Sequence, residues 1–236
     1  MTDFISIVLP VHNEFLNLRY LIEEWDSQLK KISKIQHEFV IVEDGSSDGT
    51  KDLIIELEKT FTIVNLSSEK KRGYSQAVLD GIKASNGNYI LCTDSDNQIK
   101  VDSLIENFNC LPEENEFLIG YRNPRKDPWN RLIYSQLFKV LHNVLFQSKL
   151  KDPSCPFVLG LNSTFKKLNN ENLLLMKEGF WWGFVAISLK TKIKFIQKPI
   201  VHFERLEGEA GYQLKNLPGI IFRNILGLIK IKFLSL

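Results

Sequence analysis

Cysteine is scarce in this chain of 236 residues, which holds only Cys92, Cys110 and Cys155. Their odd number and wide spacing give neither a disulfide framework nor a zinc-binding pattern. Cys92 also lies inside an apolar stretch, as a reduced and buried thiol would. We therefore expect a protein of a reducing compartment.

Signals for export and for membrane spanning are also missing. The first residues, Met1-Thr2-Asp3, have neither the basic nor the long apolar region of a signal peptide. The apolar stretch 217–236 is interrupted by Arg223, Lys230 and Lys232, whereas a spanning helix needs roughly 18 to 20 uncharged residues. These observations predict a cytoplasmic protein.

Two common nucleotide-binding motifs are absent. Residues 45–51 are one residue short of a P-loop and have Thr50 where its lysine belongs, and no Gly-x-Gly-x-x-Gly follows the first apolar stretch. A kinase-type or dinucleotide-binding function is therefore disfavoured. Gly45 and Gly49 indicate turns instead, and Asp48 indicates an N-cap before a helix from Lys51.

Short apolar stretches do alternate with helical patterns through the first half of the chain. The predicted strands lie at 4–10, 38–43, 61–65, 88–93 and 116–121. This alternation predicts an α/β fold with a mostly parallel central sheet flanked by helices, and the length suits one domain. Residues 127–149 indicate a further helix, and 192–203 two short strands broken at Pro199.

Two carboxylates stand one residue apart at the end of the fourth predicted strand. Residues 89–98 read Tyr-Ile-Leu-Cys-Thr-Asp-Ser-Asp-Asn-Gln, so that Asp94, Asp96 and Gln98 follow an apolar run. Alternate residues at a strand end project to one side, and three oxygen donors there suit Mg²⁺ or Mn²⁺. Without a cation the paired carboxylates would repel each other.

Polar residues also follow two other strands. Residues 4–10 run into Val11-His12-Asn13-Glu14, and residues 39–42 run into Glu43-Asp44-Gly45. Ligands of open α/β sheets bind just beyond the carboxyl ends of strands. We expect these three polar segments to line one binding site.

The charge is distributed unevenly. Residues 1–96 hold 10 Lys/Arg and 16 Asp/Glu, a net charge of −6, whereas residues 97–236 hold 20 and 12, a net charge of +8. The second half therefore favours an anionic partner such as a sugar phosphate, a lipid phosphate or an anionic membrane surface. We expect no nucleic-acid partner.

These motifs together resemble the family 2 glycosyltransferases of the GT-A fold, and among them the group similar to dolichol-phosphate mannose synthase. The matching segments occur in the same order over most of the chain: 8–14, 43–50, 72–74, 94–98, Arg122, Arg131 with Ser135, 152–157 and 202–208. The resemblance implies a single GT-A (Rossmann-like) catalytic domain over residues 1–216, followed by an amphipathic segment over 217–236.

The resemblance also implies roles for individual residues. Those expected to bind the nucleotide sugar donor are Pro10, His12, Asn13, Glu14, Asp44, Gly45, Arg72, Gly73 and Asp94. Those expected to hold the diphosphate or an acceptor phosphate are Arg122, Arg131, Ser135 and His202. Asp96, Asp152 and Arg205 are the catalytic candidates, and Asp94, Asp96 and Gln98 the metal ligands.

The sequence departs from the family pattern on the acceptor side. Many members carry an acidic residue in the helix after a Gly-aromatic segment, whereas here residues 179–186 read Gly-Phe-Trp-Trp-Gly-Phe-Val-Ala, and Ala210 stands where a serine is frequent. A sugar hydroxyl needs a general base, but a phosphate monoester is already a good nucleophile at neutral pH. The missing acid therefore favours a phosphate acceptor.

The sequence thus predicts an inverting, metal-dependent transferase that moves a hexose from a GDP- or UDP-hexose to a polyprenyl phosphate. Asp152 could act as the general base instead, so a transferase acting on a saccharide or glycolipid hydroxyl remains the alternative enzyme. A non-catalytic nucleotide-sugar-binding module and a sugar-phosphate nucleotidyltransferase are the alternatives from other classes, and the intact Asp94 and Asp96 disfavour the former.

The C-terminal stretch predicts a helix on the inner membrane surface. Arg223, Gly227 and Lys230 can share one face of such a helix, with apolar residues around the rest. The alternative is a terminal helix docked on the protein's own core. The aromatic residues 180–184 are expected in the core, with an apolar acceptor channel or a membrane-facing belt as the alternative.

Overall fold

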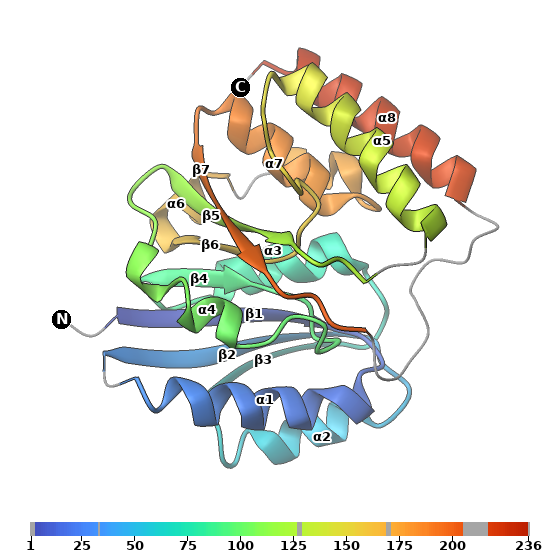
Figure 1. Ribbon diagram of the computed structural model, residues 1–236. Coiled ribbons are helices and arrows are strands. Elements are labelled where there is room, and N and C mark those ends of the chain that lie inside the picture. Colours follow the sequence, from blue (N-terminus) through green and yellow to red (C-terminus); the bar gives the residue numbers. More distant parts are fainter. Residues whose placement is uncertain (1–2, 33, 127–128, 169–170, 205–216, 236) are drawn as a thin grey trace.

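The computed structural model describes residues 3–32, 34–126, 129–168, 171–204 and 217–235 (Figure 1), without the side chains of residues 109, 129–131, 217 and 218. Seven strands form one sheet in the order β3-β2-β1-β4-β6-β5-β7. Their bounds are β1 (Asp3–Val11), β2 (Ile35–Asp44), β3 (Ile63–Ser68), β4 (Tyr89–Cys92), β5 (Glu116–Arg122), β6 (Val158–Leu161) and β7 (Lys194–Ile200). Only β6 runs antiparallel to its neighbours, β4 and β5. The mostly parallel α/β sheet expected from the sequence is confirmed.

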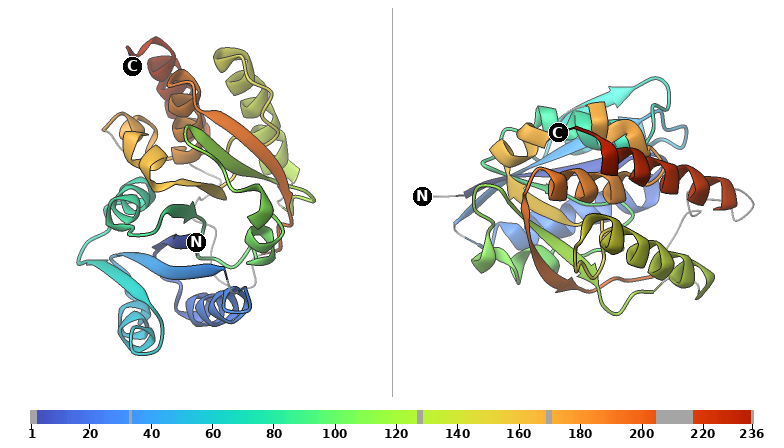
Figure 2. Two further views of the ribbon diagram at one scale, coloured as in Figure 1. Left: turned by 90° about the vertical axis from the view of Figure 1, so that its left-hand side faces the viewer. Right: turned by 90° about the horizontal axis from the view of Figure 1, so that it is seen from above.

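Eight α-helices and two short 3₁₀ segments surround this sheet in the described part of the chain. They are α1 (Phe15–Leu29), α2 (Thr50–Leu57), α3 (Tyr74–Ala84), α4 (Asp102–Ile105), α5 (Trp129–Phe146), α6 (Asn162–Leu168), α7 (Phe180–Lys190), α8 (Leu217–Phe233), η1 (Phe108–Cys110) and η2 (Glu171–Met176). Right-handed crossovers put α1 and α2 on one face of the sheet and α3 on the other (Figures 1 and 2).

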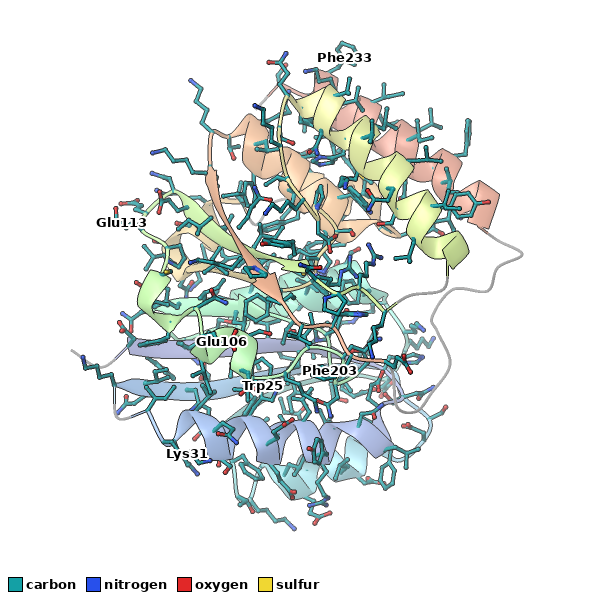
Figure 3. All side chains as sticks on the ribbon, viewed as in Figure 1. Trp25, Lys31, Glu106, Glu113, Phe203 and Phe233 are labelled. Carbon is teal, nitrogen blue, oxygen red and sulfur yellow. The ribbon has the colours of Figure 1, made fainter. Side chains whose placement is uncertain are left out.

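Helices pack closely on both faces of the sheet. Trp25 of α1 is fully buried and points toward the strands (Figure 3). On the opposite face Gly81 lets α3 approach, because a Cβ there would lie 2.4 Å from Val8 Cγ1. Further along that face, the ring of Phe117 lies 4.6 Å from that of Phe165 and 5.2 Å from that of Phe184. These contacts make one continuous core beneath α3, α6 and α7.

The second half of the fold differs from the sequence prediction at two places. The prediction that Pro199 breaks residues 192–203 into two strands is wrong, since β7 runs through it. β7 is the edge strand, so a residue without an N–H costs the sheet no hydrogen bond on the open side. The four-residue β6 was not predicted, because so short an apolar run carries little periodicity.

Two of the cysteines and most of the aromatic residues at 180–184 are buried. All three cysteines are free, and Cys92 and Cys155 are buried. Phe180, Trp181 and Phe184 are buried in the core as expected, whereas Trp182 is only partly buried against it. Within the described residues, we find no helix that is both long enough and apolar enough to cross a membrane.

The C-terminal helix α8 packs on the protein and still exposes apolar side chains. Leu228 and Ile231 are fully buried, and Phe233 is 82% exposed at its end (Figure 3). Arg223 and Lys230 are exposed, whereas Gly227, which was predicted to share their face, is buried where a Cβ would meet Met176 at 2.6 Å. α8 is therefore docked on the core along one side only.

Replacing a ring of the core cluster should destabilise the fold strongly. Phe117→Ala removes a fully buried ring, and we expect the free energy of unfolding to fall by about 3 to 5 kcal/mol. Phe233→Ala is the matched control, because that ring is largely exposed. Urea unfolding followed by circular dichroism measures both, and equal losses would contradict the placement of Phe117.

Candidate active site

The site lies where the strand order reverses. β1 pairs with β2 on one side and with β4 on the other, all three parallel, so their carboxyl ends meet at one edge of the sheet. This edge is on the right of Figure 1. Residues 12–14, 44–45 and 93–98 follow the three strands there. The predicted convergence of the three polar segments is present, at the position where open α/β sheets bind ligands.

Hydrogen bonds join the loops after β1 and β2. The backbone N–H of Asn13 donates to Ser46 Oγ at 2.9 Å, and the N–H of Ser47 donates to Asn13 Oδ1 at the same distance. The N–H of Glu14 donates to Thr50 Oγ1 at 3.1 Å. Asn13 and Glu14, both predicted donor residues, are thereby held at the carboxyl edge.

Asp48 joins the same two loops. Its carboxylate accepts the hydroxyl of Thr50 at 2.5 Å and the backbone N–H of Phe15 at 3.2 Å. The prediction that Asp48 is the N-cap of the next helix is wrong, because Gly49 occupies the cap and α2 begins at Thr50. Burial opposes ionisation of Asp48, but these hydrogen bonds outweigh it and lower the pKa of the carboxyl group.

Asp44 organises the side of the site where the nucleotide is predicted to bind. Its two carboxylate oxygens accept the backbone N–H groups of Arg72 at 2.6 Å and Gly73 at 2.8 Å. The guanidinium of Arg72 donates to Asp80 at 2.7 Å. Gly45 has φ +72°, and a Cβ there would lie 2.7 Å from the backbone nitrogen of Lys71. These four donor candidates are thus gathered in one place, where Asp44 holds the 72–73 segment.

Glu43 is a neighbouring carboxylate to which the sequence assigned no role of its own. It is fully buried and accepts hydrogen bonds from the backbone of Ser46 and from Ser67 Oγ, the latter at 2.7 Å. Burial raises its pKa, but these bonds and the ammonium of Lys51, 3.7 Å away, lower it overall. Glu43 therefore supports the loop around the donor candidates.

Asp94 and Asp96 face each other closely enough to perturb ionisation. Burial, and next the carboxylate of Asp96, raise the pKa of Asp94 to about 7, against the lowering effects of Tyr74 and Arg122. The hydroxyl of Tyr74 donates to Asp94 Oδ1 at 2.6 Å. Two neighbouring carboxylates in a partly buried site are a favourable place for a cation.

Gln98 is fixed by the segment after β7. Its side-chain nitrogen donates to the carbonyl of Phe203 at 3.0 Å, and the Phe203 N–H donates to the Gln98 carbonyl at 2.9 Å. Ile99 and His202 form a bridge beside these bonds. Figure 3 shows Phe203 in this extended segment below the end of β7. The predicted acceptor residue His202 is thereby brought beside the predicted metal ligand Gln98.

The oxygen donors suit an open metal site. In the described parts of the chain no three His, Cys, Asp or Glu residues are grouped as a preformed cluster. Asp94 and Asp96 supply two carboxylates, and their mutual repulsion is the property that a divalent cation relieves. Mg²⁺ is commonly held by one or two carboxylates together with substrate phosphates, so these residues fit such an ion.

The end of β1 provides two further predicted donor residues. Ser95 Oγ donates to the carbonyl of Pro10 at 2.8 Å, which fastens the Asp94–Asp96 turn to β1. The Nδ1 atom of His12 is buried, and no residue in the described ranges hydrogen-bonds to it. An orphaned ring nitrogen at this edge is available to a bound ligand.

Arg122 and Asp152 form a buried ion pair on the predicted acceptor side. Arg122 Nε donates to Asp152 Oδ2 at 2.7 Å and Nη2 donates to Oδ1 at 2.9 Å. Ser154 bridges the two side chains, with its oxygen 2.8 Å from Arg122 Nη2. Burial would raise the pKa of Asp152, but Arg122, Arg125 and Ser154 lower it to about 2. Asp152 is therefore a poor proton acceptor at neutral pH.

Of the other predicted phosphate-binding residues, Ser135 lies near this ion pair, and the side chains of Arg131 and Arg205 lie outside the described residues. Arg125, which the sequence did not single out, donates to Ser135 Oγ of α5 at 2.6 Å and lies 4.0 Å from Asp152. Arg131 belongs to α5, but its side chain lies outside the described residues, as does all of Arg205. Their roles stay predictions.

The chain belongs to glycosyl transferase family 2, whose model matches residues 6–172. A dolichyl-phosphate β-glucosyltransferase of Dictyostelium discoideum is 27% identical, over 97% of this chain and 77% of that protein. An undecaprenyl-phosphate 4-deoxy-4-formamido-L-arabinose transferase of Edwardsiella ictaluri (strain 93-146) is 24% identical, over 93% of this chain and 66% of that protein. This chain thus spans slightly less than two thirds of the second relative.

Solved structures share the fold at low sequence identity. Glucosyl-3-phosphoglycerate synthase from Mycobacterium tuberculosis, in complex with Mn²⁺, UDP-glucose and glycerol 3-phosphate, superposes with a TM-score of 0.70 at 15% identity, covering 99% of this chain and 81% of that one. A mannosyltransferase from Pyrobaculum calidifontis in complex with GDP-mannose and Mn²⁺ gives 0.65 at 15% identity, covering 98% and 63%. These matches confirm the GT-A fold.

The Arg122–Asp152 pair should make stability depend on acidity. The folded pKa of Asp152 is about 2, below the ordinary value of 3.8, so its contribution is present above pH 4 and is lost as the pH falls toward 2. The shift corresponds to about 2 kcal/mol at neutral pH. Asp152→Asn should therefore lower the free energy of unfolding at pH 7 by at least this amount.

Urea unfolding of both proteins from pH 7 to pH 3 measures the effect. The difference between wild type and Asp152→Asn should narrow below pH 4. Asp102→Asn, at the exposed start of α4, is the matched control. A difference in unfolding free energy that stays constant from pH 7 to pH 3 would show that the pKa of Asp152 is not lowered in the folded protein.

Proposed function

We propose that this protein is an inverting, metal-dependent hexosyltransferase that moves a hexose from a GDP- or UDP-hexose to a polyprenyl phosphate. The names of two relatives include dolichyl phosphate and undecaprenyl phosphate, which supports a lipid phosphate as acceptor. Two neighbours of the same fold were solved with Mn²⁺ and with UDP-glucose or GDP-mannose, which supports the donor class and the metal.

The donor would lie over the carboxyl ends of β1, β2 and β4. The 72–73 segment, held by Asp44, would cover the nucleotide, and the orphaned Nδ1 of His12 would receive a donor group. Asp94, Asp96 and Gln98 would hold Mg²⁺ or Mn²⁺. When bound, such an ion neutralises the charge that grows on the leaving diphosphate, an electrostatic effect worth several kcal/mol in enzymes of this kind.

The ion pair of Asp152 is the observation that carries the choice of acceptor. A sugar hydroxyl must lose its proton during attack, and a carboxylate with a pKa of about 2 takes that proton poorly. A phosphate monoester needs no such base, because its second pKa is about 6. Asp152 therefore serves to hold Arg122 in place, and Arg122, His202 and Arg205 would face the acceptor phosphate.

The reaction then needs mainly positioning and charge stabilisation from the protein. The acceptor oxygen attacks the anomeric carbon as the bond to the nucleoside diphosphate breaks, through a transition state with oxocarbenium character. Attack opposite the leaving group inverts the configuration. Bound in line, the two substrates gain the proximity that such a displacement requires.

Transfer of a radiolabelled sugar tests this proposal. With polyprenyl phosphate and Mn²⁺, the label should enter an organic-extractable product that mild acid cleaves, and EDTA or Asp96→Ala should abolish the transfer while leaving the melting temperature unchanged. Label that moves only to saccharide hydroxyls, and is lost in Asp152→Asn, would establish the hydroxyl-acceptor alternative instead.

The same proposal places the enzyme at the inner face of the membrane, with α5 and α8 as the contact. The two helices run alongside each other on the upper right of Figure 1. Both expose apolar side chains, namely Ile133, Tyr134, Leu137, Val140 and Val144 on α5 and Phe222, Leu226, Ile229 and Phe233 on α8. Single exposed apolar residues are ordinary, but a face built from two helices favours a lipid surface.

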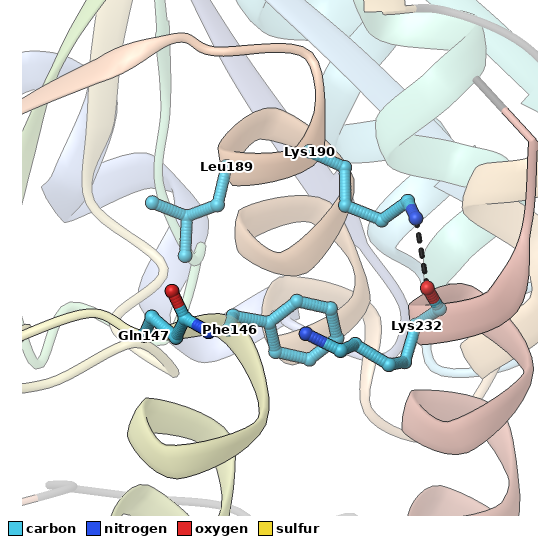
Figure 4. A pocket seen from close by; sticks show the side chains of 5 residues that line it. All are labelled: Phe146, Gln147, Leu189, Lys190 and Lys232. Atoms are coloured by element: carbon cyan, nitrogen blue, oxygen red, sulfur yellow. Dashed lines mark hydrogen bonds between the residues drawn. The ribbon is translucent and has the colours of Figure 1, made fainter.

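Basic groups lie at one end of this apolar face. Figure 4 shows an open hollow between the ends of α5, α7 and α8, lined by Phe146, Gln147, Leu189, Lys190 and Lys232. The ammonium of Lys190 donates to the Lys232 carbonyl at 2.8 Å, and that of Lys232 lies 6.0 Å from the centre of the Phe146 ring. Lysines beside an apolar face suit anionic headgroups.

Flotation with liposomes tests the contact. The protein should float with vesicles that contain phosphatidylglycerol, and binding should weaken with salt because each basic residue contributes roughly 1 kcal/mol on an anionic surface. The double variant Leu137→Ser, Phe222→Ser should float at least tenfold less. Leu16→Ser, an exposed position on α1, is the matched control. Equal flotation of all three proteins would show that α5 and α8 do not form the membrane contact.

A further inference from the structure

A chain of two hydrogen bonds runs from α7 through the start of α3 to Asp94. Tyr74 is the first residue of α3, and its hydroxyl lies 2.6 Å from Asp94 Oδ1. Trp181 belongs to α7, and its indole Nε1 lies 2.7 Å from the Tyr74 oxygen. The contact between Tyr74 and Trp181 spans 107 positions of the chain. The tertiary fold, not local sequence, therefore creates this chain of hydrogen bonds.

The direction of both hydrogen bonds follows from their chemistry. The indole N–H of Trp181 can only donate, so the Tyr74 oxygen is the acceptor there. The tyrosine proton is then directed to Asp94 Oδ1, and the short distance of 2.6 Å suits a hydroxyl donating to a carboxylate. This bond fixes one oxygen of Asp94 and, through it, the orientation of the whole carboxylate.

Trp181 is held too firmly to turn away from Tyr74. It is buried, and its ring packs edge-on against Phe180 at 5.0 Å and against Phe184 at 5.4 Å. The ring of Phe180 also contacts Tyr74, with centroids 6.3 Å apart. A hydrogen bond from so fixed a donor fixes the tyrosine hydroxyl in turn.

Neighbouring contacts hold the two helices that carry the tyrosine and the tryptophan. Ser75 Oγ donates to the carbonyl of Lys177 at 2.7 Å, which ties the start of α3 to the segment before α7. The Glu178 carboxylate accepts hydrogen bonds from Arg223 Nε at 2.8 Å and from Arg223 Nη2 at 2.7 Å, which ties that segment to α8. The start of α7 is therefore fastened on two sides, next to Trp181.

We propose that Tyr74 and Trp181 are positioning residues that orient the Asp94 carboxylate toward the donor's cation. The inference rests on the proposed function, because it takes Asp94 as a metal ligand. Tyr74 also directly follows the 72–73 segment held by Asp44, so one short stretch of chain joins the nucleotide side of the site to the metal side. Groups that orient metal ligands in this way are typically worth 10- to 100-fold in metal affinity.

Binding of Mn²⁺ in the presence of UDP or GDP tests the inference without turnover. Free Mn²⁺ is measured by electron paramagnetic resonance for wild type, Tyr74→Phe and Trp181→Phe. Tyr74→Phe keeps the ring and removes the hydroxyl, and the Kd for Mn²⁺ should rise about 10- to 100-fold. Trp181→Phe keeps an aromatic ring and removes the N–H, so its Kd should rise in the same direction by a smaller factor.

The dependence of kcat on Mn²⁺ concentration is a second measurement, and it would not change if the two residues only stabilised the fold. Saturating Mn²⁺ should restore most of the kcat of Tyr74→Phe, because the lost orientation acts on metal affinity. Tyr89→Phe, at the amino end of β4, is the matched control and should bind Mn²⁺ as wild type does. Thermal unfolding of each variant shows whether it is still folded. If Tyr74→Phe is destabilised, the Mn²⁺ affinity of Trp181→Phe decides the test.

The possible outcomes separate the two proposals. Mn²⁺ binding by Tyr74→Phe and Trp181→Phe with the wild-type Kd would overturn the inference and leave the proposed function intact. Wild-type protein that binds no Mn²⁺ with either nucleotide, or Asp96→Ala that binds it equally well, would overturn the proposed metal site itself.

Discussion

The crowding of negative charge at the carboxyl edge of the parallel sheet is the constraint on which the rest of the site depends. Parallel pairing of β1, β2 and β4 brings Glu43, Asp44, Asp94 and Asp96 to that edge, because each follows or ends one of these strands. Every buried carboxylate needs donors or positive charge nearby. Backbone N–H groups of the 46 and 72–73 turns satisfy Glu43 and Asp44. Asp94 accepts the Tyr74 hydroxyl and Asp96 accepts the backbone N–H of Gln98, yet burial and the charge of Asp96 still raise the pKa of Asp94, and a divalent cation would relieve this repulsion.

Charge is handled differently on the acceptor side of the same edge. There Asp152 is matched by the bidentate guanidinium of Arg122, so its charge is compensated within the protein. A carboxylate paired with a guanidinium orients its partner and is a weak base, whereas two neighbouring carboxylates favour a bound cation. The proposed function therefore assigns the cation to the two carboxylates on one side and an anion to the carboxylate-held arginine on the other. The excess of basic residues in the second half of the chain is consistent with this division.

Local sequence signals were enough for the first half of the fold and for much of the site. Long apolar runs ended by polar clusters located β1, β2 and β4 and the edge where Asp44, Asp94 and Asp96 meet, because strand ends in a parallel sheet converge. The strand β6 was not predicted, because four residues are too few to show a hydrophobic period. Pro199 was wrongly predicted to break a strand, because a proline is tolerated in β7 only through the position of that strand at the sheet edge, which the sequence does not reveal. The link from Trp181 through Tyr74 to Asp94 carried no sequence signal, since its members meet only through packing of α3 and α7.

The proposed membrane contact and the acceptor site are connected through α5. The residues just before this helix include Arg125, which reaches both Ser135 of the helix and the ion pair around Asp152. Further along, α5 exposes Leu137 and Val144 beside the apolar side chains of α8. A lipid phosphate carries its charge at one end and its chains at the other. Under the proposed function, α5 would follow such an acceptor from its phosphate near Arg125, which precedes the helix, to its chains along the exposed apolar side chains, with α8 held beside it by its buried Leu228 and Ile231.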